Sequence, residues 1–155
     1  MAIQRTVVGF HQDEAGDWVA ALDCGHGVHV RHNPPFMNRP WVVSEAGRRA
    51  ALGEPRDCVR CERLEWPEGL TPYKRTPEFT AASIPPGLLE DHATRAGVWG
   101  KIHVTQGRLT YRVDDLDGRE MVLDANTPGI IAPALRHRVA PLGDVQFYVE
   151  FYRKQ

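Results

Sequence analysis

The sequence lacks a long hydrophobic run, an excess of either charge and an even set of cysteines. No apolar stretch approaches the ~20 residues that a membrane-spanning helix needs, and the N-terminus turns acidic too early for a secretory signal. With 19 basic and 20 acidic residues the net charge is −1, which leaves no basic surface for nucleic acid. Three cysteines make a disulfide framework unexpected and favour a reduced, cytoplasmic setting.

Two parts of different character are expected, residues 1–66 and residues 67–155. The stretch 66–72 is rich in proline and glycine and has no hydrophobic period, which is typical of a linker. The first part is predicted to be a small α+β module. Its predicted elements are strands over 5–10, 18–24 and 28–32, a helix over 45–51 capped by Ser44, and a helix beginning at Cys58 and capped by Asp57.

The second part is a succession of short strands with turn signals and no long helix, so the chain is predicted to be mainly β. Asp117-Gly118 indicates a hairpin between strands 108–113 and 119–123, and a further short strand is expected from Gly129. Gly143-Asp144 is predicted to be the turn of a last hairpin, between strands 137–140 and 145–152. Gln106-Gly107 is expected to end an earlier strand. This pattern favours a β-sandwich or a small barrel.

The thiols and imidazoles of the first part have the spacing of zinc ligands. Cys58 and Cys61 stand three residues apart at a predicted helix start, so both sulfur atoms can face one point, and Cys24 adds a third ligand. The fourth ligand is either His26, at the hairpin turn, or His29, which a two-residue turn would place opposite Cys24. The Cys-x-His spacing with a later Cys-x2-Cys resembles the second metal site of RING-type fingers, which favours His26.

Four protein ligands would close the zinc site, so its expected role is structural. The hydrophobic core of so short a segment is marginal, and a bound metal would stabilise it. Two histidines are then left over. His29 and His32 are expected either to support the ligands through hydrogen bonds or to form an exposed basic site with Arg31 and Arg39.

Residues 5–63 resemble a small bacterial domain family of unknown function that is considered zinc-binding. The resemblance is carried by Gly9-Phe-His-Gln-Asp-Glu, Trp18-Val-Ala, Cys24-Gly-His26, His29-Val-Arg-His32-Asn-Pro-Pro, Arg39-Pro-Trp41-Val and Cys58-x2-Cys61. It supports the metal interpretation and implies no activity.

A second group of potential ligands is predicted in the last hairpin. With a turn at Gly143-Asp144, His137 lies directly opposite Glu150, and both side chains share one face. His92 would complete a set of two histidines and one carboxylate, which is known from open metal sites. His103 alternates out of phase with its apolar neighbours and is expected on the other face.

The second part resembles the TehB/YeaR-like family, which is associated with tellurite resistance and has a cupin character. The resemblance covers about residues 69–153. It is carried by Pro72-Tyr-Lys-Arg-Thr-Pro-Glu-Phe79, Ile84-Pro85, His92-x-Thr94, Gly97-Val-Trp99-Gly100, Gln106-Gly107, Pro133-x3-His137 and Val149-Glu150-Phe-Tyr-Arg153. It implies a cupin-like double-stranded β-helix barrel with a divalent metal in its mouth.

The chain departs from the usual cupin pattern, because Gly100 stands where a ligating glutamate is common. His92, His137 and Glu150 are therefore the expected substitute ligands for a second divalent metal. Relatives in this family often carry a methyltransferase as well. The chain has no glycine-rich nucleotide loop after a strand, so methyl transfer is not expected from it alone.

The function expected from these observations is that of a metal-binding, cupin-type stress-response protein. It would handle tellurite or a related small oxyanion, with the zinc module in a structural role. A metal-dependent, oxygenase-like enzyme using the two-histidine, one-carboxylate site is the first alternative. An adaptor that binds a protein partner through the N-terminal module is the second. Since cupin barrels often pair through edge strands, the resemblance also favours a homodimer.

Overall fold

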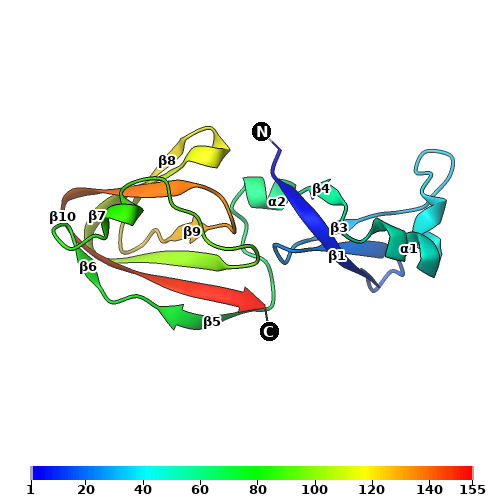
Figure 1. The fold of residues 1–155 in the computed structure, drawn as a ribbon, viewed down its shortest axis with the longest axis horizontal. Coiled ribbons are helices and arrows are strands. Elements are labelled where there is room, and N and C mark those ends of the chain that lie inside the picture. Colours follow the sequence, from blue (N-terminus) through cyan, green and yellow to red (C-terminus); the bar gives the residue numbers. More distant parts are fainter. Residues whose placement is uncertain (1, 155) are drawn as a thin grey trace. The chain divides into compact units, whose positions relative to one another are not determined.

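The computed structural model describes residues 2–154, which form two compact units (Figure 1). We call Ala2–Arg63 the N-terminal unit, and we call the unit that begins at Leu64 the C-terminal unit. Each unit has its own β-sheet. No helix within the described residues is long and apolar enough to cross a membrane.

The N-terminal unit is built on four antiparallel strands in the order β3-β2-β1-β4. The strands are β1 (Gln4–Gln12), β2 (Trp18–Leu22), β3 (Gly27–His29) and β4 (Pro55–Asp57). Alternate side chains of a strand point to opposite faces, so Ile3, Arg5 and Val7 face the interior at the start of β1. One of these three inward positions, that of Arg5, carries a charge, and its partner is described with the candidate site below.

Three short helical segments complete the N-terminal unit: η1 (Pro40–Val43), α1 (Glu45–Ala51) and α2 (Val59–Glu62). Helix α1 has the predicted bounds, and the Ser44 side chain accepts a hydrogen bond from the backbone N–H of Gly47. The predicted cap of the second helix is wrong, since Cys58 and not Asp57 is the N-cap of α2. Asp57 is the last residue of β4 because it pairs with Gln4 of β1.

The hydrophobic core of the N-terminal unit contains only small and medium-sized side chains. Its buried apolar residues other than cysteine are Ile3, Val7, Val19, Ala20, Leu22, Val30, Val42 and Ala51. No aromatic side chain of the unit is fully buried among the described residues. A unit of this size with so modest a core is at the limit of independent stability.

The C-terminal unit is an antiparallel sheet in the order β5-β10-β7-β8, in which β6 pairs with β10 and β9 pairs with β7. Two short 3-10 helices, η2 (Pro86–Leu88) and η3 (Asp114–Leu116), lie between strands. The strands are β5 (Leu70–Arg75), β6 (Phe79–Thr80), β7 (Trp99–Val113), β8 (Arg119–Leu123), β9 (Gly129–Ile131) and β10 (His137–Lys154). The prediction of a mainly β protein is confirmed.

The hairpin predicted at Asp117-Gly118 is confirmed. Strands β7 and β8 pair from Leu109 with Leu123 to Val113 with Arg119. Asp117 and Gly118 both have positive φ angles, 56° and 68°, as a reversal of this kind requires. The residue types at the turn were therefore sufficient to predict that β7 and β8 form a hairpin.

The turn predicted at Gly143-Asp144 is wrong. Both halves of β10 pair with β7 and not with each other, and the two residues lie in a bulge where the register shifts between Leu142 and Val145. Figure 1 shows that β10 bends strongly along its length. Opposite the bulge, Gly107 of β7 has a φ of +79°, and β7 also continues through the predicted break. The two extra residues of β10 are accommodated as a bulge, and a bulge bends the strand that carries it.

The predicted cupin barrel is not formed, because the sheet of the C-terminal unit stays open. Its path ends at β5 on one side and at β8 on the other, and these two strands do not pair within the described residues. A barrel requires that such edges close by hydrogen bonding.

Three large side chains of the C-terminal unit, Trp99, Tyr111 and Phe147, are fully buried and form the centre of its core.

Candidate functional site

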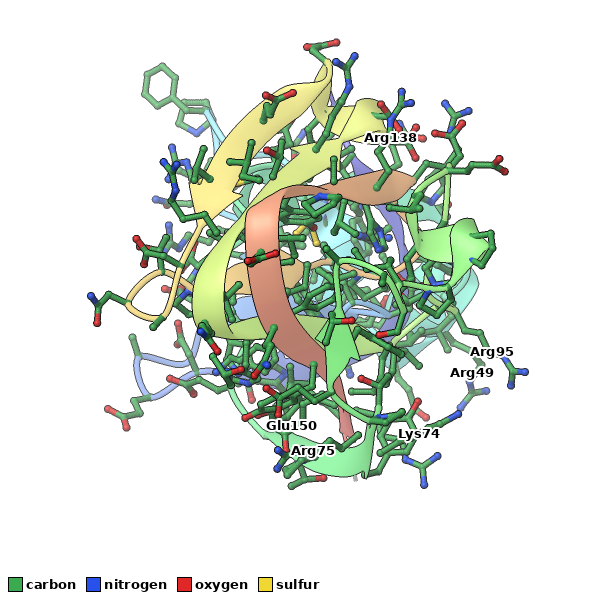
Figure 2. All side chains as sticks on the ribbon, turned by 90° about the vertical axis from the view of Figure 1, so that its left-hand side faces the viewer. Arg49, Lys74, Arg75, Arg95, Arg138 and Glu150 are labelled. Atoms are coloured by element: carbon green, nitrogen blue, oxygen red, sulfur yellow. The ribbon has the colours of Figure 1, made fainter. Side chains whose placement is uncertain are left out.

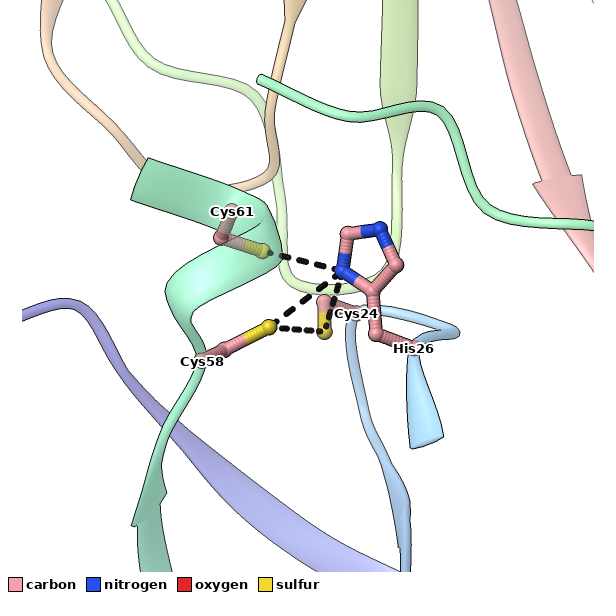
Figure 3. A group of neighbouring side chains, drawn as sticks. All are labelled: Cys24, His26, Cys58 and Cys61. Carbon is pink, nitrogen blue, oxygen red and sulfur yellow. Dashed lines mark hydrogen bonds between the residues drawn. The ribbon is translucent and has the colours of Figure 1, made fainter. Parts of the chain in front are cut away.

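Four potential metal ligands meet inside the N-terminal unit: Cys24, His26, Cys58 and Cys61 (Figure 3). The first two come from the turn between β2 and β3, and the other two come from the start of α2. None of the four is more than 2% exposed. Their ligand atoms all lie within 4.8 Å of one another.

The distances within this cluster match those between zinc ligands. Nδ1 of His26 lies 3.5 Å from the sulfur of Cys24 and 3.3 Å from that of Cys58. The same nitrogen lies 3.5 Å from the sulfur of Cys61, and the sulfur atoms of Cys24 and Cys58 are 3.8 Å apart. Tetrahedral zinc, with bonds of about 2.3 Å to sulfur and 2.0–2.1 Å to nitrogen, separates two sulfurs by about 3.8 Å and sulfur from nitrogen by about 3.5–3.6 Å. The cluster is therefore compatible with a zinc site.

A tight turn positions the first pair of ligands. The N–H of Gly25 donates to the carbonyl of Leu22, and the N–H of Leu22 donates to the carbonyl of His26. Gly25 has a φ of +97°, which glycine adopts without strain. The chain thereby turns between Cys24 and His26, so that both side chains reach the same interior point.

His29 is not part of the cluster. It lies opposite Val19 in the register of β3 and β2, and the two-residue turn that would have paired it with Cys24 does not occur. Its Nε2 lies 2.8 Å from a carboxylate oxygen of Asp13, and this hydrogen bond is the main cause that lowers the pKa of Asp13. Of the two candidates for the fourth ligand, the structure therefore brings only His26 to the cysteines.

The other surplus histidine also has a local partner. Nδ1 of His32 accepts a hydrogen bond of 2.9 Å from the backbone N–H of Arg39, and the Arg39 guanidinium donates to the carbonyl of Arg31. These contacts tie together the two ends of the loop after β3. His29 and His32 thus organise the surface of the N-terminal unit, away from the cluster.

The four clustered groups shift one another's pKa values because they are close and buried. Burial lowers the pKa of His26, but hydrogen bonds with Cys24 and Cys58 outweigh it and raise the pKa to about 9. Hydrogen bonds with Cys24 and Cys61 lower the pKa of Cys58, whereas those with Cys24 and Cys58 raise the pKa of Cys61. A divalent cation can replace the protons that these thiols share, because thiols bind a metal in their deprotonated form.

Arg5 is a neighbour of the cluster that the sequence analysis missed. Its side chain is buried, and its Nε donates a hydrogen bond of 3.3 Å to the sulfur of Cys61. A signal was present, because Arg5 stands between Ile3 and Val7 at an inward position of β1. A charged residue in such a position usually has a buried partner of opposite charge.

The second predicted ligand set is only partly brought together. The backbones of His92 and His137 exchange hydrogen bonds of 2.9 and 2.8 Å, and their rings meet edge to face with centroids 5.4 Å apart. Glu150 lies elsewhere: it accepts a hydrogen bond of 2.6 Å from the Tyr152 hydroxyl and lies 3.6 Å from Nε2 of His103. His103, which was excluded, is thus the histidine beside this carboxylate.

The separation follows from the strand register and from the face that Glu150 occupies. His137 pairs with Val113 and Glu150 with Lys101. Val149 and Phe151 line the same cavity as His137, so Glu150, which stands between them, points to the opposite face of the strand. Figure 2 shows Glu150 beside Arg75 and well apart from Arg138, the neighbour of His137. Within residues 2–154, three or more potential metal ligands meet only in the cluster of the three cysteines and His26.

His137 instead lines a small apolar cavity of about 40 Å³. The residue is 3% exposed, and burial lowers its pKa, so the imidazole is neutral at pH 7. Nδ1 lies 3.1 Å from the carbonyl oxygen of Leu135, which can only accept, so Nδ1 carries the proton. The unprotonated Nε2 is consequently the atom of this ring that can accept a hydrogen bond from a ligand.

Family comparisons divide the chain in the same way as the structure. Residues 8–65 match a family described as "Protein of unknown function (DUF3565)", and residues 74–149 match the TehB-like domain. The first part of the chain is therefore similar to the DUF3565 family and the second part is similar to the TehB-like domain.

Two curated relatives from two strains of Haemophilus influenzae both carry the name "Probable S-adenosyl-L-methionine-dependent methyltransferase TehB". They are 31% and 30% identical to this chain over 88 residues. The match covers 54% of this chain and 31% of each relative, so the chain spans about a third of the length of these proteins.

Two solved structures are similar to the C-terminal unit. TehB from Haemophilus influenzae has a TM-score of 0.52 at 29% identity, and the match covers 56% of this chain and 32% of that one. A protein from Escherichia coli K12 has a TM-score of 0.53 at 20% identity, with 59% of this chain and 97% of that one covered. The second likeness is one of fold alone.

The predicted function is wrong in the light of these relatives. Proteins that share the TehB-like domain are named as S-adenosylmethionine-dependent methyltransferases, so a metal-binding cupin that handles tellurite in a stress response is not supported. The oxygenase-like alternative required Glu150 beside His92 and His137, but Glu150 bonds to Tyr152 instead. The adaptor alternative relied on His29 and His32, and both of these histidines have hydrogen-bond partners within their own unit.

Proposed function

We propose that Cys24, His26, Cys58 and Cys61 bind one Zn²⁺ that holds the N-terminal unit together. The observation that carries this proposal is the spacing of the four ligand atoms, which matches a zinc tetrahedron in all four distances given above. Three sulfurs and one nitrogen leave no position for water or substrate. The metal's contribution is therefore structural, because it links the β2–β3 turn to α2.

The charge of the surroundings supports a metal in this position. Three thiolates, one neutral imidazole and Zn²⁺ sum to a charge of −1, and the buried guanidinium of Arg5 carries the opposite charge at hydrogen-bonding distance from Cys61. A buried charge is stable only when it is paired in this way. Arg5 would also orient its thiolate through the N–H···S bond.

Metal analysis of the purified protein tests the proposal. We expect one equivalent of zinc per chain by mass spectrometry, retained in His29→Ala and lost in Cys58→Ser. The His29 variant is the matched control, because that imidazole is near in sequence but bonded to Asp13. Retention of stoichiometric zinc by Cys58→Ser, or its loss from His29→Ala, would contradict this ligand set.

A second candidate function concerns the C-terminal unit and rests on the similarity to TehB. We propose that this unit serves S-adenosylmethionine-dependent methyl transfer by holding the molecule that receives the methyl group. The support is the 31% identity over 88 residues to a protein named as such a methyltransferase. The unit is built from antiparallel strand pairs, whereas nucleotide-type cofactors commonly bind at the edge of a parallel sheet.

A domain replacement tests this second candidate. Residues 67–155 of the chain would replace the matching segment of Haemophilus influenzae TehB, and methyl transfer from labelled S-adenosylmethionine would be measured. We expect the chimera to retain more activity than a TehB variant from which the segment is deleted. Equal activity of a folded chimera and the deletion variant would overturn the proposal, and thermal melting would establish that both proteins are folded.

A further inference from the structure

Two hollows of the C-terminal unit meet beneath His92. The apolar cavity of about 40 Å³ and an open pocket of about 380 Å³ are both lined by His92, Thr94 and Phe151. Because these three residues line both spaces, the two hollows are neighbours, and we call the open pocket the mouth and the cavity the inner end. The metal cluster belongs to the other unit, so this hollow needs an explanation of its own.

The inner end is lined mainly by apolar side chains, and its polar residues are His92, His137 and two threonines. Ile102, Ile131 and Phe147 contribute hydrocarbon surface to it. Its two threonines are already engaged: the Thr76 hydroxyl accepts from the N–H of Val149 and donates to the carbonyl of Pro77, and the Thr94 hydroxyl donates to the carbonyl of Val98. Nε2 of neutral His137 is one hydrogen-bond acceptor open to a ligand, since no residue among the described ones bonds to it.

The mouth is positively charged. Lys74 and Arg95 line it together with Tyr73, and no acidic residue does so. Neither cation forms an ion pair within the part of the chain that the structure describes. Figure 2 shows both side chains reaching outward on the same side of the unit. An anionic group in the mouth would meet uncompensated positive charge, whereas a cation would be repelled.

We propose that the mouth and the inner end are continuous and bind a short aliphatic carboxylate, with its tail in the cavity and its carboxylate between Lys74 and Arg95. A cavity of about 40 Å³ is much smaller than the ~150 Å³ that accommodates benzene, so the tail has only a few carbons. A hydroxyl at the end of the tail gains a hydrogen bond to Nε2 of His137. Inorganic anions have no tail to fill the apolar end and bind more weakly.

The proposal depends neither on zinc nor on methyl transfer, so its failure would leave both functions above untouched. The test is a titration of the full-length, zinc-containing protein, followed by amide chemical shifts in NMR spectra. The probes are butanoate, 4-hydroxybutanoate, butylammonium and phosphate at equal ionic strength. We expect saturable shifts at Thr94, Ile131 and Val139 with the two carboxylates, tightest with 4-hydroxybutanoate, and none with butylammonium.

Variants separate the mouth from the inner end. The double variant Lys74→Gln, Arg95→Gln is expected to weaken butanoate about tenfold, because two exposed charges together contribute roughly 1.4 kcal/mol. Arg108→Gln, an exposed cation of β7 outside the hollow, is the matched control and should bind like the wild type. Leu88→Trp should fill the cavity and abolish binding, because Leu88 lines it and is half-buried.

Three results would overturn the proposal. Equal shifts with butanoate and butylammonium would remove the role of the cations, and equal shifts with phosphate would remove the role of the tail. Unchanged butanoate affinity in the double variant would place the binding elsewhere. The double variant changes only exposed side chains, so it decides the question even if Leu88→Trp is unstable.

Discussion

Removing zinc is expected to unfold the N-terminal unit and to leave the C-terminal unit folded. A structural zinc contributes roughly 10–16 kcal/mol of apparent binding free energy, which equals or exceeds the ~5–15 kcal/mol by which a whole domain is stable. The buried apolar residues of this unit are aliphatic and few, with Val7, Val30 and Val42 among the largest that are fully buried. They cannot replace the link between the β2–β3 turn and α2.

The two units respond separately because each has its own core. Trp99, Tyr111 and Phe147 all belong to the C-terminal unit and are fully buried, whereas no aromatic side chain of the N-terminal unit is fully buried among the described residues. Loss of the metal would also leave a guanidinium buried beside uncoordinated thiols, since Arg5 bonds to Cys61. That uncompensated charge adds to the cost.

Amide NMR spectra before and after a strong zinc chelator measure this effect residue by residue. Signals from 2–63 should collapse into the range of unfolded chains, and those from 70–154 should keep their positions. Cys58→Ser should give the same spectrum without chelator, while His29→Ala should resemble the wild type. A chelated protein that keeps dispersed signals for β1 and β2 would show that the core of the N-terminal unit suffices without metal.

Replacing Gly107 by alanine is expected to destabilise the C-terminal unit by roughly 2–5 kcal/mol. Gly107 has a φ of +79°, which costs a residue with a Cβ about 1–2 kcal/mol. The added Cβ would also overlap the backbone carbonyl of Asp144 across the bulge. Because that obstacle is backbone and not a flexible side chain, β7 and β10 would have to move apart.

Two further glycines separate the contributions to this loss. Gly143→Ala has a similar φ of +75° but no atom within 4 Å of the new Cβ, so it should cost only the conformational part, about 1–2 kcal/mol. Gly87→Ala meets neither obstacle and should change stability by less than about 0.5 kcal/mol. Urea unfolding of the three variants gives the values, and a Gly107→Ala protein as stable as Gly143→Ala would contradict the close approach at the bulge.

Features that depend on a few consecutive residues were predicted well. Helix α1 has the predicted bounds because Ser44 caps it, and the β7–β8 hairpin forms because Asp117 and Gly118 tolerate positive φ angles. The pairs Cys24-x-His26 and Cys58-x2-Cys61 indicated a joint site because each pair presents two ligands in one direction. Local stereochemistry alone carried these inferences.

Features that depend on strand register were predicted poorly. A bulge at Gly143-Asp144 was mistaken for a turn, because glycine and aspartate are common in both. The error placed Glu150 opposite His137, whereas the long strand carries it to Lys101. The ligand set of the second metal site and the oxygenase-like alternative depended on that pairing, whereas the closed barrel was implied by the family resemblance.

The sequence by itself thus determined the kinds of ligand in the N-terminal unit, the mainly β character and the TehB-like resemblance of the second part. Only the tertiary structure decided that His26 and not His29 faces the three cysteines, that Arg5 joins them, and that Glu150 lies with His103. The physical reason is that side chains alternate along a strand, so a shift of one residue moves a side chain to the opposite face. The register of a strand depends on the strands it pairs with, which lie far away in the sequence. The residue type at one position therefore does not reveal the register.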